Sequence, residues 1–88
     1  MTDQLSIIIV DDHAIFRKGV LETLGPQAEL KVIGEGASRD DAIDLVERLK
    51  PAVALIDLSM PGGGIQATRD IHARYPSVKI IVLTVSEE

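Results

Sequence analysis

Residues 51–61 read PAVALIDLSMP, which places a proline, a short apolar run, an acidic residue and a loop in direct succession. The run at 53–56 is apolar at every position, which is typical of a central strand buried on both faces of a parallel sheet. Pro51 ends the segment before the run, because proline cannot continue a helix. We therefore expect a buried strand whose carboxyl end carries Asp57.

Similar apolar runs lie on both sides of this strand, separated by amphipathic stretches. Gly25-Pro26, Pro51 and Pro76 end these stretches, as expected of helix terminators. An alternation of strands and helices predicts an α/β fold, a parallel sheet with helices on both faces. Right-handed crossovers favour the strand order 2-1-3-4, with the first helix on one face and the other two on the opposite face. The expected strands are 5–10, 30–34, 53–56 and 78–83, and the expected helices are 14–24, 39–49 and 65–75.

Periodic spacing also predicts which residues face the core. In the second strand, Leu30, Val32 and Gly34 share one face. The expected inner face of helix 14–24 is Phe16, Val20 and Leu24. For helix 39–49 it is Ala42, Leu45, Val46 and Leu49, and for helix 65–75 it is Ile65, Thr68, Ile71, His72 and Tyr75.

Composition excludes several classes of protein. The chain has 88 residues, 45% of them hydrophobic, which suits one small domain, expected to span 1–88, and excludes a disordered segment. Its net charge of −5 argues against direct nucleic-acid binding, and the absence of cysteine fits a reducing compartment. The first residues lack the features of a signal peptide, and no apolar run is long enough to span a bilayer. We expect a cytoplasmic domain.

Three carboxylates fall at one predicted edge of the sheet. Asp11 and Asp12 follow the first strand, and Asp57 follows the third. With strands one and three as neighbours, these ends border the crevice where α/β sheets bind ligands. Uncompensated carboxylates would repel one another, and oxygen ligands without histidine or cysteine point to Mg²⁺ and not to zinc. These residues could instead be structural caps of strand ends. That explanation suits a single Asp, but it poorly explains three of them at adjacent strand ends.

Two neighbouring residues carry less information on their own. Thr84 follows the fourth strand and opens onto the same edge, where its hydroxyl could donate to an anion on Asp57. His13 follows the acidic pair, and we interpret it as a helix-start side chain at the rim and not as a metal ligand.

Taken together, these motifs resemble the receiver domain of two-component response regulators. They are Ile-Val-Asp11-Asp12, Leu-Ile-Asp57-Leu-Ser-Met-Pro61 and Ile-Val-Leu-Thr84, in the family's order and spacing along essentially the whole chain. The resemblance implies a flavodoxin-like (CheY-like) three-layer fold. The Asp-Asp-His opening and the segment Pro-Gly-Gly-Gly-Ile-Gln-Ala-Thr-Arg resemble the subgroup that carries a C-terminal LuxR-type helix-turn-helix, so the resemblance also implies a DNA-binding regulator of transcription.

The resemblance further implies a role for each site residue. Asp57 would accept a phosphoryl group from the phosphohistidine of a sensor histidine kinase and become an aspartyl phosphate. Asp12 and Asp57 would bind Mg²⁺ through their carboxylates, Asp11 mainly through water, and Ser59 through its backbone carbonyl. Thr84 would contact the phosphoryl oxygen and move towards it. Such a phosphoprotein is not an enzyme beyond its own phosphorylation and dephosphorylation.

The family's fold continues through a fourth helix, a fifth strand that ends in a phosphate-pairing lysine, and a fifth helix. The 88 residues stop before these elements, and Lys79 stands at the wrong end of its strand to replace that lysine. The fourth strand would then be a free edge, so we expect homo-oligomers that form through it. Two alternatives to a phosphorelay function stay open here, namely a phosphohydrolase with an aspartyl nucleophile and an interaction domain that is never phosphorylated.

Overall fold

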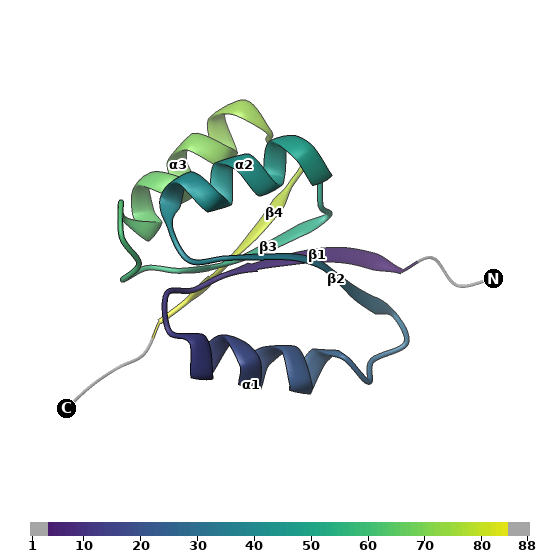
Figure 1. Cartoon of the computed structure of the whole chain (residues 1–88). Helices are drawn as coiled ribbons and strands as arrows, with labels where there is room; N and C mark the ends of the chain where they lie inside the picture. Colours follow the sequence, from purple (N-terminus) through teal and green to yellow (C-terminus); the bar gives the residue numbers. More distant parts are fainter. Residues whose placement is uncertain (1–3, 85–88) are drawn as a thin grey trace.

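The computed structural model describes residues 4–84; residues 1–3 and 85–88 of the expected domain lie outside this range. Four parallel strands form one sheet in the order β2-β1-β3-β4, with α1 on one face and α2 and α3 on the other (Figure 1). The predicted three-layer α/β fold and strand order are therefore confirmed. The elements are β1 (Leu5–Val10), α1 (Ala14–Leu24), β2 (Leu30–Gly36), α2 (Arg39–Leu49), β3 (Val53–Asp57), α3 (Gly64–Arg74) and β4 (Lys79–Leu83).

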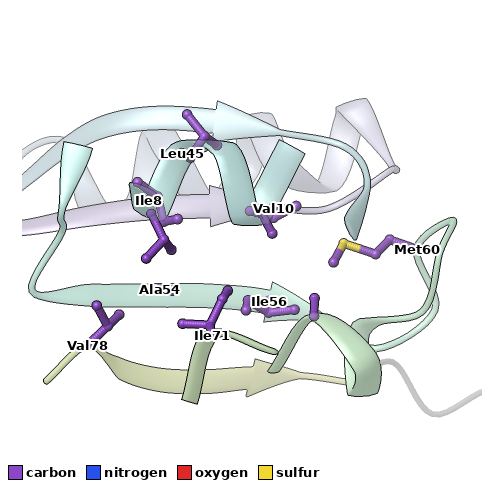
Figure 2. Packing of buried hydrophobic residues seen from close by; sticks show 11 residues of the cluster. Ile8, Val10, Leu45, Ala54, Ile56, Met60, Ile71 and Val78 are labelled. Atoms are coloured by element: carbon purple, nitrogen blue, oxygen red, sulfur yellow. The ribbon is translucent and has the colours of Figure 1, made fainter. Parts of the chain in front are cut away.

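The two central strands, β1 and β3, supply most of the core because helices cover both of their faces. Their side chains alternate between two clusters, as the period of a strand requires. One cluster lies beneath α2 and α3 and contains Ile8, Val10, Ala54 and Ile56 (Figure 2). The other lies beneath α1 and contains Ile7, Ile9, Val53 and Leu55. This packing explains why both runs are apolar at every position.

Strand β2 differs from the prediction in length and in the direction of its side chains. It continues to Gly36, and its pairing with β1 shifts, so that Ile7 lies opposite Val32 but Ile8 lies opposite Gly34. Ile33 is the extra residue of this β-bulge, which reverses the alternation of faces beyond it. Gly34 consequently faces α2, where an added Cβ would lie 2.9 Å from methyl carbons of Leu45 and Leu49. The prediction that Gly34 shares a face with Leu30 and Val32 is wrong.

Helix α3 is rotated relative to the prediction. Gly64, Ala67 and Ile71 are its buried residues, whereas Ile65 is 55% exposed and His72 is exposed. The expected inward orientation of Ile65 and His72 is therefore wrong. Gly64 packs directly on the backbone of Asp57 and Leu58, which sets the rotation of the helix and turns the next residue about 100° away from the sheet.

Helix α1 covers its face of the sheet only in part. Val20 and Leu24 pack on the cluster beneath α1 as predicted, but Phe16 is 40% exposed and no α1 residue is fully buried. Within the described residues, no helix is long and apolar enough to cross a membrane.

Candidate metal centre

The predicted gathering of carboxylates at the end of β1 and β3 is present in the structure. Val10 pairs with Ile56, so Asp11, which follows β1, and Asp57, the last residue of β3, are neighbours. One carboxylate oxygen each from Asp11, Asp12 and Asp57 and one ring nitrogen of His13 all lie within 4.8 Å of one another. Asp11 and Asp57 are only 2% and 4% exposed, while the Asp12 side chain is 30% exposed. Two carboxylates are thus held inside the sheet edge and a third lies at its mouth.

His13 lies closer to this cluster than a rim position implies. Its Nδ1 atom is 3.2 Å from Asp11 Oδ1, 3.1 Å from Asp12 Oδ1 and 3.9 Å from Asp57 Oδ2. The ring is still 64% exposed, as expected of a residue that begins a helix. Among residues 4–84, it is the one basic side chain with a nitrogen within 4.0 Å of these carboxylates.

The turn between β1 and α1 fixes the orientation of Asp11. The His13 amide donates to Asp11 Oδ1 at 2.8 Å, and the Asp11 amide donates to the Gly36 carbonyl at 3.0 Å. The Arg17 guanidinium donates to the Asp11 carbonyl and, through Nε, to Glu35 at 3.0 Å. Arg17 therefore ties the end of β1 to β2. Sequence reasoning missed it, because a basic residue on the first turns of a helix is usually solvated.

Ser59 contacts the Asp57 carboxylate directly. Its hydroxyl donates to Asp57 Oδ2 at 3.0 Å and lies 3.2 Å from Oδ1, and its amide donates to Oδ1 at 3.3 Å. The family resemblance implied only a metal-binding backbone carbonyl at Ser59, and that role stays a prediction. The two observed donors hold the carboxylate in one orientation at the end of β3.

Thr84 lies at the same edge of the sheet. Asp57 pairs with Leu83, and the Leu58 amide donates to the Leu83 carbonyl at 3.2 Å, so the ends of β3 and β4 are joined. Thr84 follows at once and is exposed. Its contact with a phosphoryl group stays a prediction.

The donor set fits a hard divalent cation. Three carboxylates face one another without a lysine or arginine paired to them in the described residues, so their repulsion calls for a cation. Their oxygen atoms are the ligands that Mg²⁺ prefers, whereas the nitrogen of His13 is a poorer match. The cluster of Asp11, Asp12 and Asp57 is thus consistent with a metal site, and its assignment to Mg²⁺ stays a prediction.

Replacement of Asp12 tests this assignment with little risk to the fold, because this carboxylate is the most accessible of the three. Asp12→Ala is expected to weaken Mg²⁺ binding by about tenfold or more, since affinity for such ions follows the number of charged ligands. Calorimetric titration with MgCl₂ measures the change in Mg²⁺ affinity. Glu22→Ala, which removes the same charge from an exposed position of α1, is the matched control. Equal Mg²⁺ affinity in both variants would contradict the assignment.

Comparison with known proteins identifies relatives of this site and fold. Residues 7–88 match the family model described as the response regulator receiver domain. The chain is 40% identical over 87 residues to the transcriptional regulatory protein DegU of Brevibacillus brevis. This alignment covers 98% of this chain and 37% of that protein. It is 37% identical over 81 residues to the DNA-binding transcriptional activator DevR/DosR of Mycobacterium tuberculosis, covering 91% of this chain and 37% of that protein.

The fold has matches among solved structures as well. The RcsB response regulator of Salmonella typhimurium, solved in a study of conformational dynamism for DNA interaction, superposes with a TM-score of 0.89. The sequences are 34% identical, and the match covers 97% of this chain and 44% of that one. The chain thus spans roughly two fifths of the length of these relatives.

Proposed function

This chain belongs to the response regulator receiver domain family, and we propose that Asp57 accepts a phosphoryl group from a sensor histidine kinase in a two-component phosphorelay. The observation that carries the proposal is the position of Asp57: it is nearly buried, at the end of a central strand, within a cluster of carboxylates suited to a cation. The proposed domain is residues 1–88, the N-terminal part of a receiver.

In the proposed reaction, a carboxylate oxygen of Asp57 is the nucleophile. It forms a bond to phosphorus while the P–N bond of the donor phosphohistidine breaks, and the electron pair stays on the donor's imidazole. Carboxylates are established covalent acceptors of phosphoryl groups. The Ser59 hydroxyl and amide orient the Asp57 carboxylate before the attack, which lowers the entropic cost of aligning it.

The neighbouring side chains complete the proposed site. Asp12 and Asp57 hold Mg²⁺ through their carboxylates, Asp11 acts mainly through water, and Ser59 adds its backbone carbonyl. When bound, Mg²⁺ neutralises charge on the transferring phosphoryl oxygens. Thr84, at the end of the adjacent strand, donates its hydroxyl to the phosphoryl group and shifts towards it, which passes the signal on.

We also propose the wider setting of the domain. DegU is named as a transcriptional regulatory protein, and DevR/DosR as a DNA-binding transcriptional activator. RcsB was solved in a study of DNA interaction. This receiver is accordingly proposed to control a C-terminal helix-turn-helix effector in the cytoplasm, and to bind no nucleic acid through residues 1–88. Its chemistry is restricted to gaining and losing its own phosphoryl group.

Incubation with acetyl phosphate and Mg²⁺ tests the proposal. We expect intact-mass analysis to show one added phosphoryl group, which is lost in acid and mapped to Asp57. Beryllofluoride should bind only in the presence of Mg²⁺. Multiple turnover of a small phosphate ester would favour a phosphohydrolase instead, and no adduct under any of these conditions would favour an interaction domain.

The edge of β4 supports a proposed self-association of the 88-residue chain. Among the described strands, β4 pairs with β3 alone, and Ile81 and Val82 on it are 51% and 41% exposed. An exposed apolar edge strand pairs readily with another chain. Light scattering across a concentration series should show dimers or larger species. Ile81→Lys is expected to weaken them by about tenfold, or roughly 1.4 kcal/mol. A clean monomer at high concentration would rule this out.

A further inference from the structure

The loop that follows Asp57, residues 58–63, is held from outside by the first residue of α2. The Arg39 amide donates to the Pro61 carbonyl at 3.0 Å. The Arg39 side chain reaches α3, where its Nε and Nη2 atoms donate to Asp70 Oδ2 at 3.0 and 2.6 Å. Arg39 therefore connects α2 with the loop and with α3, which follows the loop directly in the sequence.

The contact between Arg39 and the loop is close. Gly62 has φ +85°, and a Cβ added there would lie 2.7 Å from the Cβ of Arg39. Gly63 also has a positive φ, of +89°. Two consecutive glycines give the loop much conformational freedom when nothing restrains it. The aliphatic part of the Arg39 side chain packs against Gly62, one of these two glycines.

Met60 anchors the same loop from inside. It is 2% exposed, and its side chain extends from the loop into the cluster beneath α2 and α3 (Figure 2). The Gly63 amide donates to the Met60 carbonyl at 3.0 Å, and the Gly64 amide donates to the Leu58 carbonyl at 3.2 Å. Met60 thus fixes one side of the loop, and Arg39 restrains the other.

The loop matters for the site because it carries Ser59, whose hydroxyl and amide contact the Asp57 carboxylate. We propose that Arg39, through its ion pair with Asp70, is a positioning residue that keeps loop 58–63 in the conformation competent for Mg²⁺ and phosphoryl transfer. The proposal rests on the proposed function of Asp57. The hydrogen bonds of Arg39 go to Pro61 of the loop and to Asp70 of α3 and not to Asp57, so Arg39 acts on Asp57 indirectly, by holding the loop and the start of α3 in place.

The expected effect follows from populations. If loss of the ion pair lowers the fraction of chains with an ordered loop, the apparent affinity for Mg²⁺ falls by that same fraction. The pair is partly exposed, 39% for Arg39 and 28% for Asp70, so its loss should affect the loop more than the global fold.

Arg39→Met tests the ion pair, because it keeps the aliphatic contact with Gly62 and removes the donors to Asp70. We expect amide exchange at Gly63 and Gly64, followed by NMR, to accelerate about fivefold or more. The Mg²⁺ dissociation constant should rise by the factor by which the ordered fraction of the loop falls. The phosphorylation rate at saturating acetyl phosphate and Mg²⁺ should change less than the Mg²⁺ affinity, because saturating metal selects the ordered loop. Arg39→Lys should restore part of the Mg²⁺ affinity.

Arg48→Met is the matched control. It breaks the Arg48–Asp44 pair on the same helix, which does not touch the loop, and should leave glycine exchange and Mg²⁺ affinity unchanged. Asp70→Asn tests the pair from its other side, and should reproduce the effects of Arg39→Met without adding to them in the double variant.

The outcomes separate this inference from the proposed function. Unchanged exchange and Mg²⁺ affinity in Arg39→Met and Asp70→Asn, with normal phosphorylation of Asp57, would overturn the role of Arg39. Equal effects in the Arg48→Met control would also overturn it. If the unmodified chain neither binds Mg²⁺ nor gains a phosphoryl group, the proposed function fails, and exchange at Gly63 and Gly64 still reports whether Arg39 restrains the loop.

Discussion

Asp57→Asn is expected to reduce phosphoryl incorporation from acetyl phosphate to background, a loss of about 1000-fold or more. The amide is close to the carboxylate in shape, so it occupies the same place at the end of β3, but it is uncharged and a poor nucleophile. Mg²⁺ binding should weaken too, because one of three clustered carboxylates has been neutralised. Intact-mass analysis and calorimetric titration measure the two effects.

The fold should survive this substitution. Asp57 contributes a negative charge to a repulsive cluster, so the free energy of unfolding without Mg²⁺ should stay the same or rise slightly. Asp44→Asn, an identical change on the exposed face of α2, should leave phosphorylation intact. An adduct of undiminished yield in Asp57→Asn would place the acceptor on another residue and refute the proposed mechanism.

Gly64→Ala is expected to lower the free energy of unfolding by about 3 kcal/mol or more, the largest stability effect of any small substitution proposed for this chain. A Cβ at this position would overlap the carbonyl oxygen of Asp57 and lie 2.5 Å from the Cα of Leu58. Both are backbone atoms, so no rotamer change relieves the overlap. Either α3 or the end of β3 must move, and a movement of β3 displaces the acceptor itself.

Gly19→Ala is the matched control for this substitution. Gly19 lies within α1, and an added Cβ would have nothing within 4 Å. This change should stabilise the chain by roughly 0.5–1 kcal/mol, because alanine favours a helix over glycine. Urea denaturation followed by circular dichroism compares the two variants. Equal stability of Gly64→Ala and the unmodified chain would show that the turn between β3 and α3 is looser than the structure indicates.

Much of the fold could be predicted because apolar pattern and chain-breaking residues agree along the sequence. The bounds of β1, α1 and α2 are those expected, and the parallel order 2-1-3-4 follows from short alternating elements and right-handed crossovers. The errors arose where backbone packing overrides periodicity. The bulge at Ile33 changes the face of Gly34, and the contact of Gly64 with β3 changes the rotation of α3. Neither signal is visible in a single sequence.

The candidate site, like the fold, was predictable only in part. The convergence of Asp11, Asp12 and Asp57 was predictable, because residues that follow adjacent parallel strands must meet at one edge of the sheet. The contacts that orient them were not predictable. These contacts depend on side-chain directions and on long-range packing. They are the proximity of His13 to three carboxylates, the hydrogen bond from the Ser59 hydroxyl to Asp57, and the hydrogen bonds from Arg39 to Pro61 and Asp70. Local sequence therefore specified Asp57 and the strand that carries it, whereas the folded chain set its neighbours, since a hydrogen bond between distant segments exists only once they are packed together.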